Sequence, residues 1–239
     1  RQMCIRDSHK ASIQPATFIS YNRMITGRIT QYFEPLGLKL CEVTPQVLDE
    51  FQEKILLEGY TTNTVIHYHA IFGKAFKDAV RKDYLETNPM LKVDRPKKNS
   101  FRPNFYSKDE VQQLLEVSQD DPLHLCILIT AYYGLRRSEV LGLKWDSINF
   151  AMQTLTIRHT VARVTKVVEK NKTKNASSFR SFPLTDDAVR LFKILLQQEQ
   201  YYRNHFGKDY IDNDYVFTWE DGHPYSPDYV SHTFHKLLK

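Results

Sequence analysis

The stretch from residue 123 to residue 145 constrains the fold of this chain more than any other part of the sequence. Residues 123–133 form an apolar run that is long enough for a buried helix, and the run stops at Gly134. Glycine readily adopts the left-handed backbone conformation that ends helices. Two arginines, Arg136 and Arg137, follow, and a second short amphipathic segment begins after them. We therefore expect the arginines between the end of one helix and the start of another.

Arginines in such a position are well placed to bind an anion. A helix N-terminus presents unpaired N–H groups and a partial positive charge, and a guanidinium offers a planar fork of donors that fits two phosphate oxygens. The alternative is an ion pair within the protein, because Glu139 lies three residues after Arg136, where side chains on a helix meet. The spacing alone leaves both interpretations open.

The charge pattern favours a polyanionic partner. Residues 1–102 hold 16 Lys and Arg against 11 Asp and Glu, and residues 158–180 hold seven basic residues against one acid. The net charge of the 239 residues is +5. Basic residues concentrated in two regions suggest surfaces that bind a polyanion. Solvated lysines that only maintain solubility give the same pattern, and that alternative stays open.

Composition narrows the class of protein. The chain is 41% hydrophobic with only 8 Gly and 10 Pro, which is typical of a folded protein. No apolar run approaches the length of a membrane span, and no signal peptide is visible. The three cysteines, Cys4, Cys41 and Cys126, are odd in number and lack metal spacing, which predicts a reducing, cytoplasmic location.

The first domain is expected over residues 9–93 and to be helical. Apolar residues recur every three and four positions in residues 18–32, a second helix is predicted from Thr44-Pro45 to Gly59, and a third begins at residues 60–64. Basic side chains leave one side of the third helix and give the domain a basic edge. Residues 1–8 have no helical or strand period and resemble translated sequencing-adaptor sequence, so they are expected to be a non-native leader.

A linker and a second, mixed domain are predicted to follow. Residues 94–103 are polar and basic with a proline near each end, which is typical of a linker. The second domain, residues 104–239, opens with a capping box at Ser107 and Glu110. Further on the apolar period changes to two, which predicts strands. These strands are expected at residues 154–161, about 164–169 and about 179–184, with a basic turn at 171–178.

These motifs, taken in order, resemble those of the tyrosine recombinase (phage integrase) family. In that family a buried helix ends in Gly-Leu-Arg, and after one variable residue come Ser-Glu and a Leu-x-Leu-x-Trp tail; residues 134–145 match each of these types. The run from Lys172-Thr173 through Arg180 to Pro183-Leu184 resembles the β-hairpin of the family. The order of features in residues 37–89 resembles its core-binding domain.

The resemblance implies a mainly α protein. The expected parts are an N-terminal helical core-binding (SAM-like) domain and an α+β tyrosine-recombinase catalytic domain with a small antiparallel sheet, truncated at its C-terminus. It also implies that double-stranded DNA is cut and rejoined through a 3′-phosphotyrosyl intermediate by a homo-tetramer on paired sites. No cofactor, metal or membrane is expected. His232 and His235 share a helix face, but no further ligand lies nearby, so no metal site is predicted there.

The resemblance also assigns roles to individual residues. Arg136 is expected to hold the reacting phosphate, and Lys172 to act as general acid toward the leaving 5′ oxygen. Lys174 is an alternative to Lys172, because the register of the turn is not fixed by the sequence. Further DNA contacts are expected from the remaining basic residues of these motifs and of the first half, which are Arg137, Lys144, Lys174, Arg180, Lys74, Lys77, Arg81, Lys97 and Lys98.

Several catalytic groups of the family are not found in the sequence. These are a His-x-x-Arg motif, a later His or Trp, and the nucleophilic tyrosine; none of the 14 tyrosines has the context of a nucleophile. The chain is therefore interpreted as a fragment that binds DNA without strand exchange, with the missing groups beyond residue 239. The alternative is a non-catalytic DNA-binding protein derived from an integrase. A metal-dependent nuclease is a more remote alternative, since Asp212 and Asp214 lie in a generic acidic loop.

Overall fold

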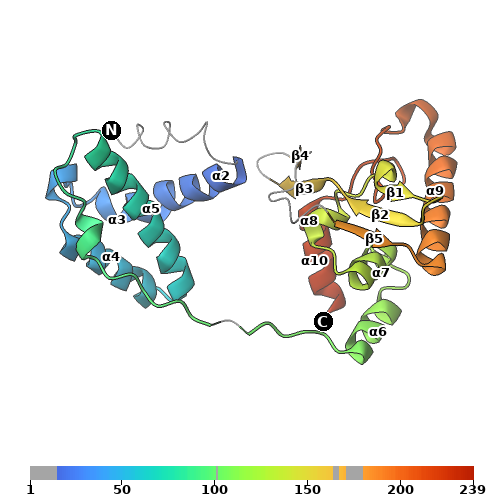
Figure 1. The fold of residues 1–239 in the computed structure, drawn as a ribbon, viewed down its shortest axis with the longest axis horizontal. Helices are drawn as coiled ribbons and strands as arrows, with labels where there is room; N and C mark the ends of the chain where they lie inside the picture. The colour runs from blue at the N-terminus through green and yellow to red at the C-terminus, as the bar shows by residue number, and fades with distance from the viewer. Residues whose placement is uncertain (1–14, 101, 164–166, 171–179) are drawn as a thin grey trace. The chain divides into compact units, whose positions relative to one another are not determined.

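The protein consists of two separately folded units. The structure, a computed structural model, describes residues 15–100, 102–163, 167–170 and 180–239. Its contacts divide the chain after Pro103, and we call residues up to 103 unit 1 and residues 104–239 unit 2. Figure 1 shows the elements of each unit.

The regular elements in the described part of unit 1 are all helices. Helices α4 and α5 begin as the sequence predicts, because Thr44 and Thr61 each accept the N–H of the residue three positions later. The C-terminal end of α4 is also as predicted, with Gly59 at a φ of 84°. The elements of unit 1 are α2 (Pro15–Met24), η1 (Ile25–Ile29), α3 (Thr30–Phe33), η2 (Leu40–Glu42), α4 (Pro45–Leu57), α5 (Thr62–Arg81) and η3 (Pro89–Lys92).

The helix predicted over residues 18–32 is interrupted. Between α2 and α3 lies a π-helical turn, η1, in which Gly27 has non-helical dihedral angles (φ −88°, ψ −111°). Two threonine hydroxyls bond to carbonyls around the interruption: Thr26 to Asn22 at 2.8 Å and Thr30 to Ile25 at 2.7 Å. The apolar period runs unchanged through the interruption, so the period did not reveal it.

An aromatic cluster forms the core of unit 1. The Phe51 side chain is fully buried, and four rings from α3 and α5 lie within 5.2 to 5.7 Å of it, mostly edge to face. These rings are Tyr32, Phe33, Tyr68 and Phe72. The cluster fixes α5 against α4, so the other side of α5 faces water.

Unit 2 combines helices with two small antiparallel β-structures. The predicted capping box is present: the Ser107 N–H donates to Glu110 Oε2 at 2.6 Å, and the Glu110 N–H to Ser107 Oγ at 3.2 Å. The elements are α6 (Lys108–Val117), α7 (His124–Tyr133), α8 (Arg137–Val140), η4 (Trp145–Ser147), β1 (Ile148–Asn149), β2 (Thr154–Ile157), β3 (Thr160–Arg163), β4 (Val167–Lys170), β5 (Arg180–Pro183), α9 (Asp186–Phe206), η6 (Gly207–Asp209) and α10 (Pro227–Leu237).

The prediction of one strand over residues 154–161 is wrong. The chain forms β2 and then β3, which belong to different structures: β2 lies between β1 and β5 in a three-stranded sheet, and β3 pairs with β4 alone. In the sheet, Leu155 is opposite Phe182 and Ile157 is opposite Arg180. The strands predicted near 164–169 and 179–184 correspond to β4 and β5, with shorter or shifted bounds. The alternation of apolar residues continues past Ile157 although the pairing partner changes there.

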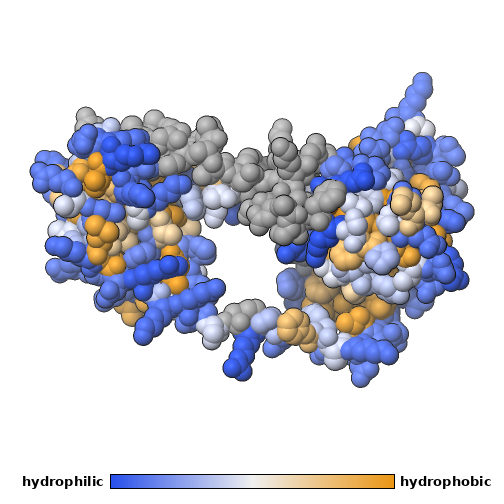
Figure 2. All heavy atoms as spheres, in the orientation of Figure 1, coloured by the Kyte–Doolittle hydropathy of each residue, from blue (hydrophilic) through white to orange (hydrophobic). Residues whose placement is uncertain are grey.

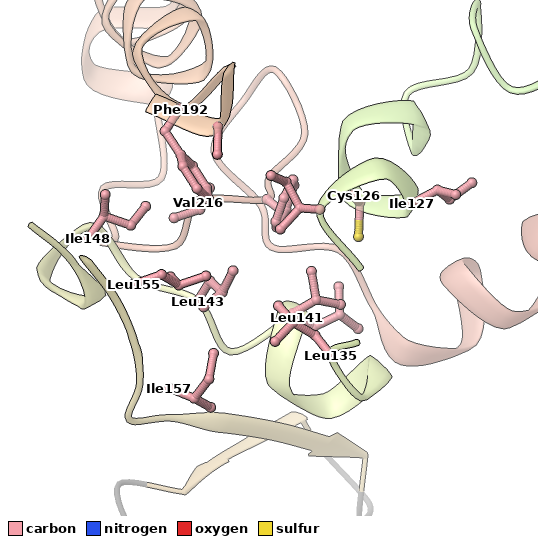
Figure 3. Packing of buried hydrophobic residues seen from close by; sticks show 14 of the residues in the cluster. Cys126, Ile127, Leu135, Leu141, Leu143, Ile148, Leu155, Ile157, Phe192 and Val216 are labelled. Atoms are coloured by element: carbon pink, nitrogen blue, oxygen red, sulfur yellow. The ribbon is translucent and has the colours of Figure 1, made fainter. Parts of the chain in front are cut away.

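The hydrophobic core of unit 2 braces the segment that carries the arginines. Figure 3 shows Leu155 and Ile157 of β2 in one buried cluster with Phe192 of α9 and with Leu141 and Leu143, which follow α8. A close backbone contact adds to this: a Cβ on Gly142 would lie only 2.6 Å from the carbonyl oxygen of His159. Only glycine fits this approach, so residues 140–143 are held between α7 and the corner that joins β2 to β3.

The surface of both units is largely hydrophilic on the face seen in Figure 2, with hydrophobic side chains in separate patches. Scattered apolar side chains are ordinary on folded proteins. Among the described residues, none of the helices has the length and apolar character that spanning a membrane requires.

Candidate nucleic-acid interface and phosphate site

The arginine segment has the turn that the sequence predicts. Gly134 ends α7 in the left-handed conformation (φ 59°, ψ 40°), and the Leu135 N–H donates to the Thr130 carbonyl at 3.2 Å. Leu135 is buried. Arg136 is then extended (φ −73°, ψ 151°) directly before α8. The buried Leu135 before Arg136 and helix α8 after it therefore fix the backbone of Arg136.

The Glu139 carboxylate binds two arginines from distant parts of the chain. Its side chain is 3% exposed. Oε1 accepts from Arg136 Nη1 at 2.6 Å, and Oε2 accepts from the Arg136 backbone N–H and from Arg180 Nη2, each at 2.8 Å. We call these three residues the Arg–Glu–Arg cluster. The ion pair that the spacing allowed between Arg136 and Glu139 is present, and Arg180 joins it.

The cluster keeps Glu139 ionised. Burial alone would raise the pKa of this carboxyl group. The hydrogen bonds from the backbone and side chain of Arg136, together with the charges of Arg180 and Arg136, outweigh burial and hold the pKa below its ordinary value. The cluster therefore contains two positive charges and one negative charge, which leaves a net charge of +1.

The Arg136 guanidinium still has donors for a ligand. Its side chain is 69% exposed, and among the described residues its guanidinium makes one hydrogen bond, from Nη1 to Glu139. The remaining donors face water and suit the oxygens of a phosphate. The backbone N–H groups at the start of α8 contribute less to anion binding than the sequence predicts. One of them, the N–H of Arg136, already donates to Glu139.

Arg180 begins β5 and lies beside Arg136. Its side chain is 34% exposed, and its guanidinium carbon is 5.4 Å from the centre of the Phe182 ring. The sequence assigned Arg180 to DNA binding and did not predict its contact with Glu139. The two residues are 41 positions apart, and the spacing rules that identify pairs on one helix do not reach that far.

Arg137 makes its contacts in another direction. Its Nη1 donates to the Pro227 carbonyl at 3.2 Å and to the Ser231 hydroxyl, and both acceptors belong to α10. The described contacts of Arg137 therefore dock α10 onto α8. Its predicted contact with DNA stays a prediction.

Of the remaining predicted residues of unit 2, the structure describes Lys144. Lys144 is half-buried, and its Nζ lies 5.0 Å from the centre of the Tyr215 ring. Lys172 and Lys174 lie outside the described residues, so their predicted roles stay predictions.

In unit 1 the predicted basic residues of α5 lie on neighbouring turns. Lys74, Lys77 and Arg81 are three and four positions apart, which places them along one side of the helix. The Lys74 Nζ is 6.0 Å from the Tyr21 ring centre, Lys77 is exposed, and Arg81 pairs with Asp78 at 3.0 Å. Two further lysines, Lys97 and Lys98, are exposed in a segment without regular secondary structure.

The acidic and histidine residues considered for metal binding do not gather into a site. Asp212 pairs with Arg203 at 2.7 Å, and the Asp214 carbonyl accepts the Trp145 N–H at 2.9 Å. His232 and His235 both lie on α10. Within the part of the chain that the structure describes, there is no group of three or more His, Cys, Asp or Glu residues that could hold a metal ion.

Two family models match the chain. The model of the phage integrase family matches residues 104–239, and the model of the phage integrase SAM-like domain matches residues 4–95. The first match covers all of unit 2. The second includes α2 to α5 and also residues 4–8, which the sequence interpretation assigned to a leader.

Relatives with similar sequences include a recombinase and an integrase. The chain is 25% identical to a tyrosine recombinase XerC-like protein of Caldanaerobacter subterraneus subsp. tengcongensis, in a match that covers 96% of the chain and 63% of the relative. It is 24% identical to the prophage ps2 probable integrase of Lactococcus lactis, over 82% of the chain and 53% of that protein. The chain thus spans less than two thirds of the length of either relative.

Solved structures show the same fold. The integrase of transposon Tn1549 in complex with circular intermediate DNA matches 98% of the chain and 76% of its own, with a TM-score of 0.76 and 17% identity. A lambda integrase dimer bound to a COC′ core site matches 99% of the chain and 61% of its own, with a TM-score of 0.72 and 16% identity. The predicted fold class, mainly α with a SAM-like domain and a small antiparallel sheet, is confirmed.

Proposed function

The chain belongs to the phage integrase family, and from this membership we propose that it acts in site-specific recombination, in which DNA is broken and rejoined through a 3′-phosphotyrosyl intermediate. The observation that carries the proposal is the exposed Arg136 guanidinium, fixed at one nitrogen by Glu139 and with its other donors facing water. None of the tyrosines of this chain is assigned as the nucleophile.

Arg136 suits phosphoryl transfer without help from a metal. Attack on a DNA phosphate builds negative charge on its non-bridging oxygens, and a preoriented guanidinium stabilises this charge. The leaving 5′ oxygen needs a proton, and Lys172 is our candidate for the acid. Proton donation by Lys172 rests on the family resemblance, because that residue lies outside the described part of the chain.

Both units are proposed to bind double-stranded DNA. The basic side of α5 in unit 1 and the exposed lysines Lys97 and Lys98 suit the phosphate backbone, which attracts positive charge regardless of sequence. Lys144, Arg137 and Lys174 are proposed as further contacts from unit 2. Lambda integrase has been solved as a tetramer bound to a Holliday junction. We propose a homo-tetramer on paired sites for the full-length protein.

Two experiments test the proposal. Fluorescence anisotropy with a labelled duplex is expected to show that this chain binds DNA with an affinity that falls as salt rises. A protein that carries the chain within a complete recombinase is then incubated with a nicked recombination site, and a covalent protein–DNA adduct is expected on a denaturing gel. Binding without an adduct would instead favour a non-catalytic DNA-binding protein, and cleavage that stops on chelation of divalent metal would favour a nuclease.

A further inference from the structure

In unit 2, the Glu139 carboxylate is shared between the guanidiniums of Arg136 and Arg180. The proposed reaction does not itself require this sharing. We propose that Arg180 is a positioning residue, which holds the Glu139 carboxylate so that the charge and the free donors of Arg136 remain available to a DNA phosphate. This inference rests on the proposed function, since it assigns a role within the same phosphate site. It replaces the sequence-based expectation that Arg180 binds DNA directly.

The sheet fixes where Arg180 can reach. Its backbone is opposite Ile157 in the register of β2 and β5, and Ile157 is fully buried. The side chain passes over the Phe182 ring before Nη2 meets Glu139 Oε2. Arg180 is therefore anchored in the sheet and aimed at the carboxylate, whereas a phosphate contact needs a guanidinium aimed at solvent.

The exposed fractions of the two side chains also distinguish Arg136 from Arg180. The Arg136 side chain is about twice as exposed as that of Arg180, and both share one buried acceptor. The Nε–H of Arg180 is buried and has no hydrogen-bond partner among the described residues. Arg136 therefore has the larger exposed surface for a ligand, whereas the Nε–H of Arg180 is buried and its Nη2 donates to Glu139.

The balance of charge explains what Arg180 contributes. A buried carboxylate paired with Arg136 alone would offset the charge that a phosphate must meet. With Arg180 present, Glu139 divides its interaction between two cations, and the cluster retains a net positive charge. Arg180 also supplies Oε2 with a second donor, so that the carboxylate stays in the position that orients Arg136.

The first test measures how many phosphate contacts the chain makes. The affinity of this chain for duplex DNA is determined at several salt concentrations for the wild type, Arg180→Met and Arg180→Lys. Each lost phosphate contact reduces the slope of log affinity against log salt by about 0.9. Lys77→Met is the control expected to lose one contact. Arg190→Met removes an exposed arginine of α9 that pairs with Asp187, and it is the control expected to lose none.

We expect Arg180→Met to change the slope by clearly less than Lys77→Met does, because Arg136 still donates to the same phosphate. A slope reduced as much as in Lys77→Met would make Arg180 a DNA contact and overturn the inference, while leaving the proposed function in place. A wild-type chain that binds no duplex DNA would overturn the proposed function and the inference with it.

The second test separates positioning from a general effect on folding. In a complete recombinase that carries this chain, Arg180→Met is expected to lower the rate of cleavage at saturating protein by about tenfold or more, with DNA affinity changed by much less. Arg180→Lys keeps a cation near Glu139 and is expected to recover much of the rate. Glu139→Gln combined with Arg180→Met should be no slower than the slower single variant, because both act through Arg136.

Unchanged cleavage in Arg180→Met, or fully additive losses in the double variant, would overturn the inference. Should Arg180→Met fold poorly, Arg180→Lys and Arg180→Gln are measured in its place. A cleavage rate that did not depend on the residue at position 180 would then overturn the inference in the same way.

Discussion

The arginines of the candidate site in unit 2 and Lys77 in unit 1 are held in different ways. In unit 2, Arg136, Arg137 and Arg180 each donate to a defined carboxylate, carbonyl or hydroxyl. In unit 1, Lys77 is exposed on α5, and within the described residues no hydrogen bond or ion pair restrains it. Stabilising a transition state requires a guanidinium at a fixed place, whereas attraction to a DNA backbone requires only charge at roughly the right distance. The fixed guanidiniums of unit 2 therefore suit the proposed chemistry, and the exposed lysine of unit 1 suits the proposed binding.

The largest expected effect comes from removing the guanidinium of Arg136. In a complete recombinase, Arg136→Ala is expected to lower cleavage by at least about 10²- to 10³-fold, the usual cost of losing one donor to a developing oxyanion. DNA affinity should fall little, because most of it comes from other phosphate contacts. Adduct formation over time and anisotropy of the same protein measure the two effects. Cleavage at the wild-type rate would mean that Arg136 is not the phosphate ligand.

The next effect concerns the stability of unit 2. Glu139→Gln removes the charge that holds both arginines and is expected to destabilise unit 2 by about 2 kcal/mol at neutral pH. The folded pKa of Glu139 is lowered, so its contribution is complete above the unfolded pKa of about 4.3 and is lost as pH falls through the folded value. The free energies of unfolding of Glu139→Gln and wild type should therefore approach each other below about pH 4. Urea denaturation from about pH 3 to about pH 7 measures them, and a difference that stayed constant with pH would contradict the assignment.

A pair of glycine substitutions should change the stability of the two units in opposite directions. Gly142→Ala places a Cβ 2.6 Å from the backbone oxygen of His159 and should destabilise unit 2 by about 1–3 kcal/mol. Gly73 lies inside α5, and a Cβ added there would meet nothing within 4 Å outside its own helix turn. Gly73→Ala should therefore stabilise unit 1 by about 0.5–1 kcal/mol. Differential scanning calorimetry of the two variants tests both signs. A tolerated Gly142→Ala would show that the arginine segment is not tightly braced.

The smallest effect is expected on the basic side of α5. Lys77→Met should weaken DNA binding a few-fold at moderate salt and lower the salt slope by about 0.9, and it should leave cleavage at saturating DNA unchanged. Anisotropy across a salt series measures the slope. Lys208→Met, in η6 of unit 2 and outside the predicted DNA surface, serves as the control. If both variants behaved alike, the basic side of α5 would not be a DNA contact.

Features set by neighbouring residues were predictable from the sequence. The caps at Thr44, Thr61 and Ser107 act within one turn of helix, and the structure contains each of them. The left-handed Gly134 after an apolar run is also a local signal. The family resemblance supplied the fold class, because it depends on the order of such local motifs along the chain.

Features set by distant residues were not predictable. The contact between Glu139 and Arg180 depends on where the sheet places β5, and no spacing rule on one helix reports it. The break between β2 and β3 depends on a change of pairing partner, while the alternation of side chains continues. The interruption at Gly27 leaves the apolar period intact in the same way. In each case the missing information is tertiary.

The dual contact of Glu139 makes the distance between residues 136 and 139 intolerant of insertion. The same carboxylate accepts the backbone N–H that starts α8 and the guanidinium that faces solvent. One extra residue in this interval would rotate the carboxylate by about 100° around the helix axis. The helix start and the aim of the arginine would then be lost together. The Arg–Glu–Arg cluster therefore requires two residues between Arg136 and Glu139.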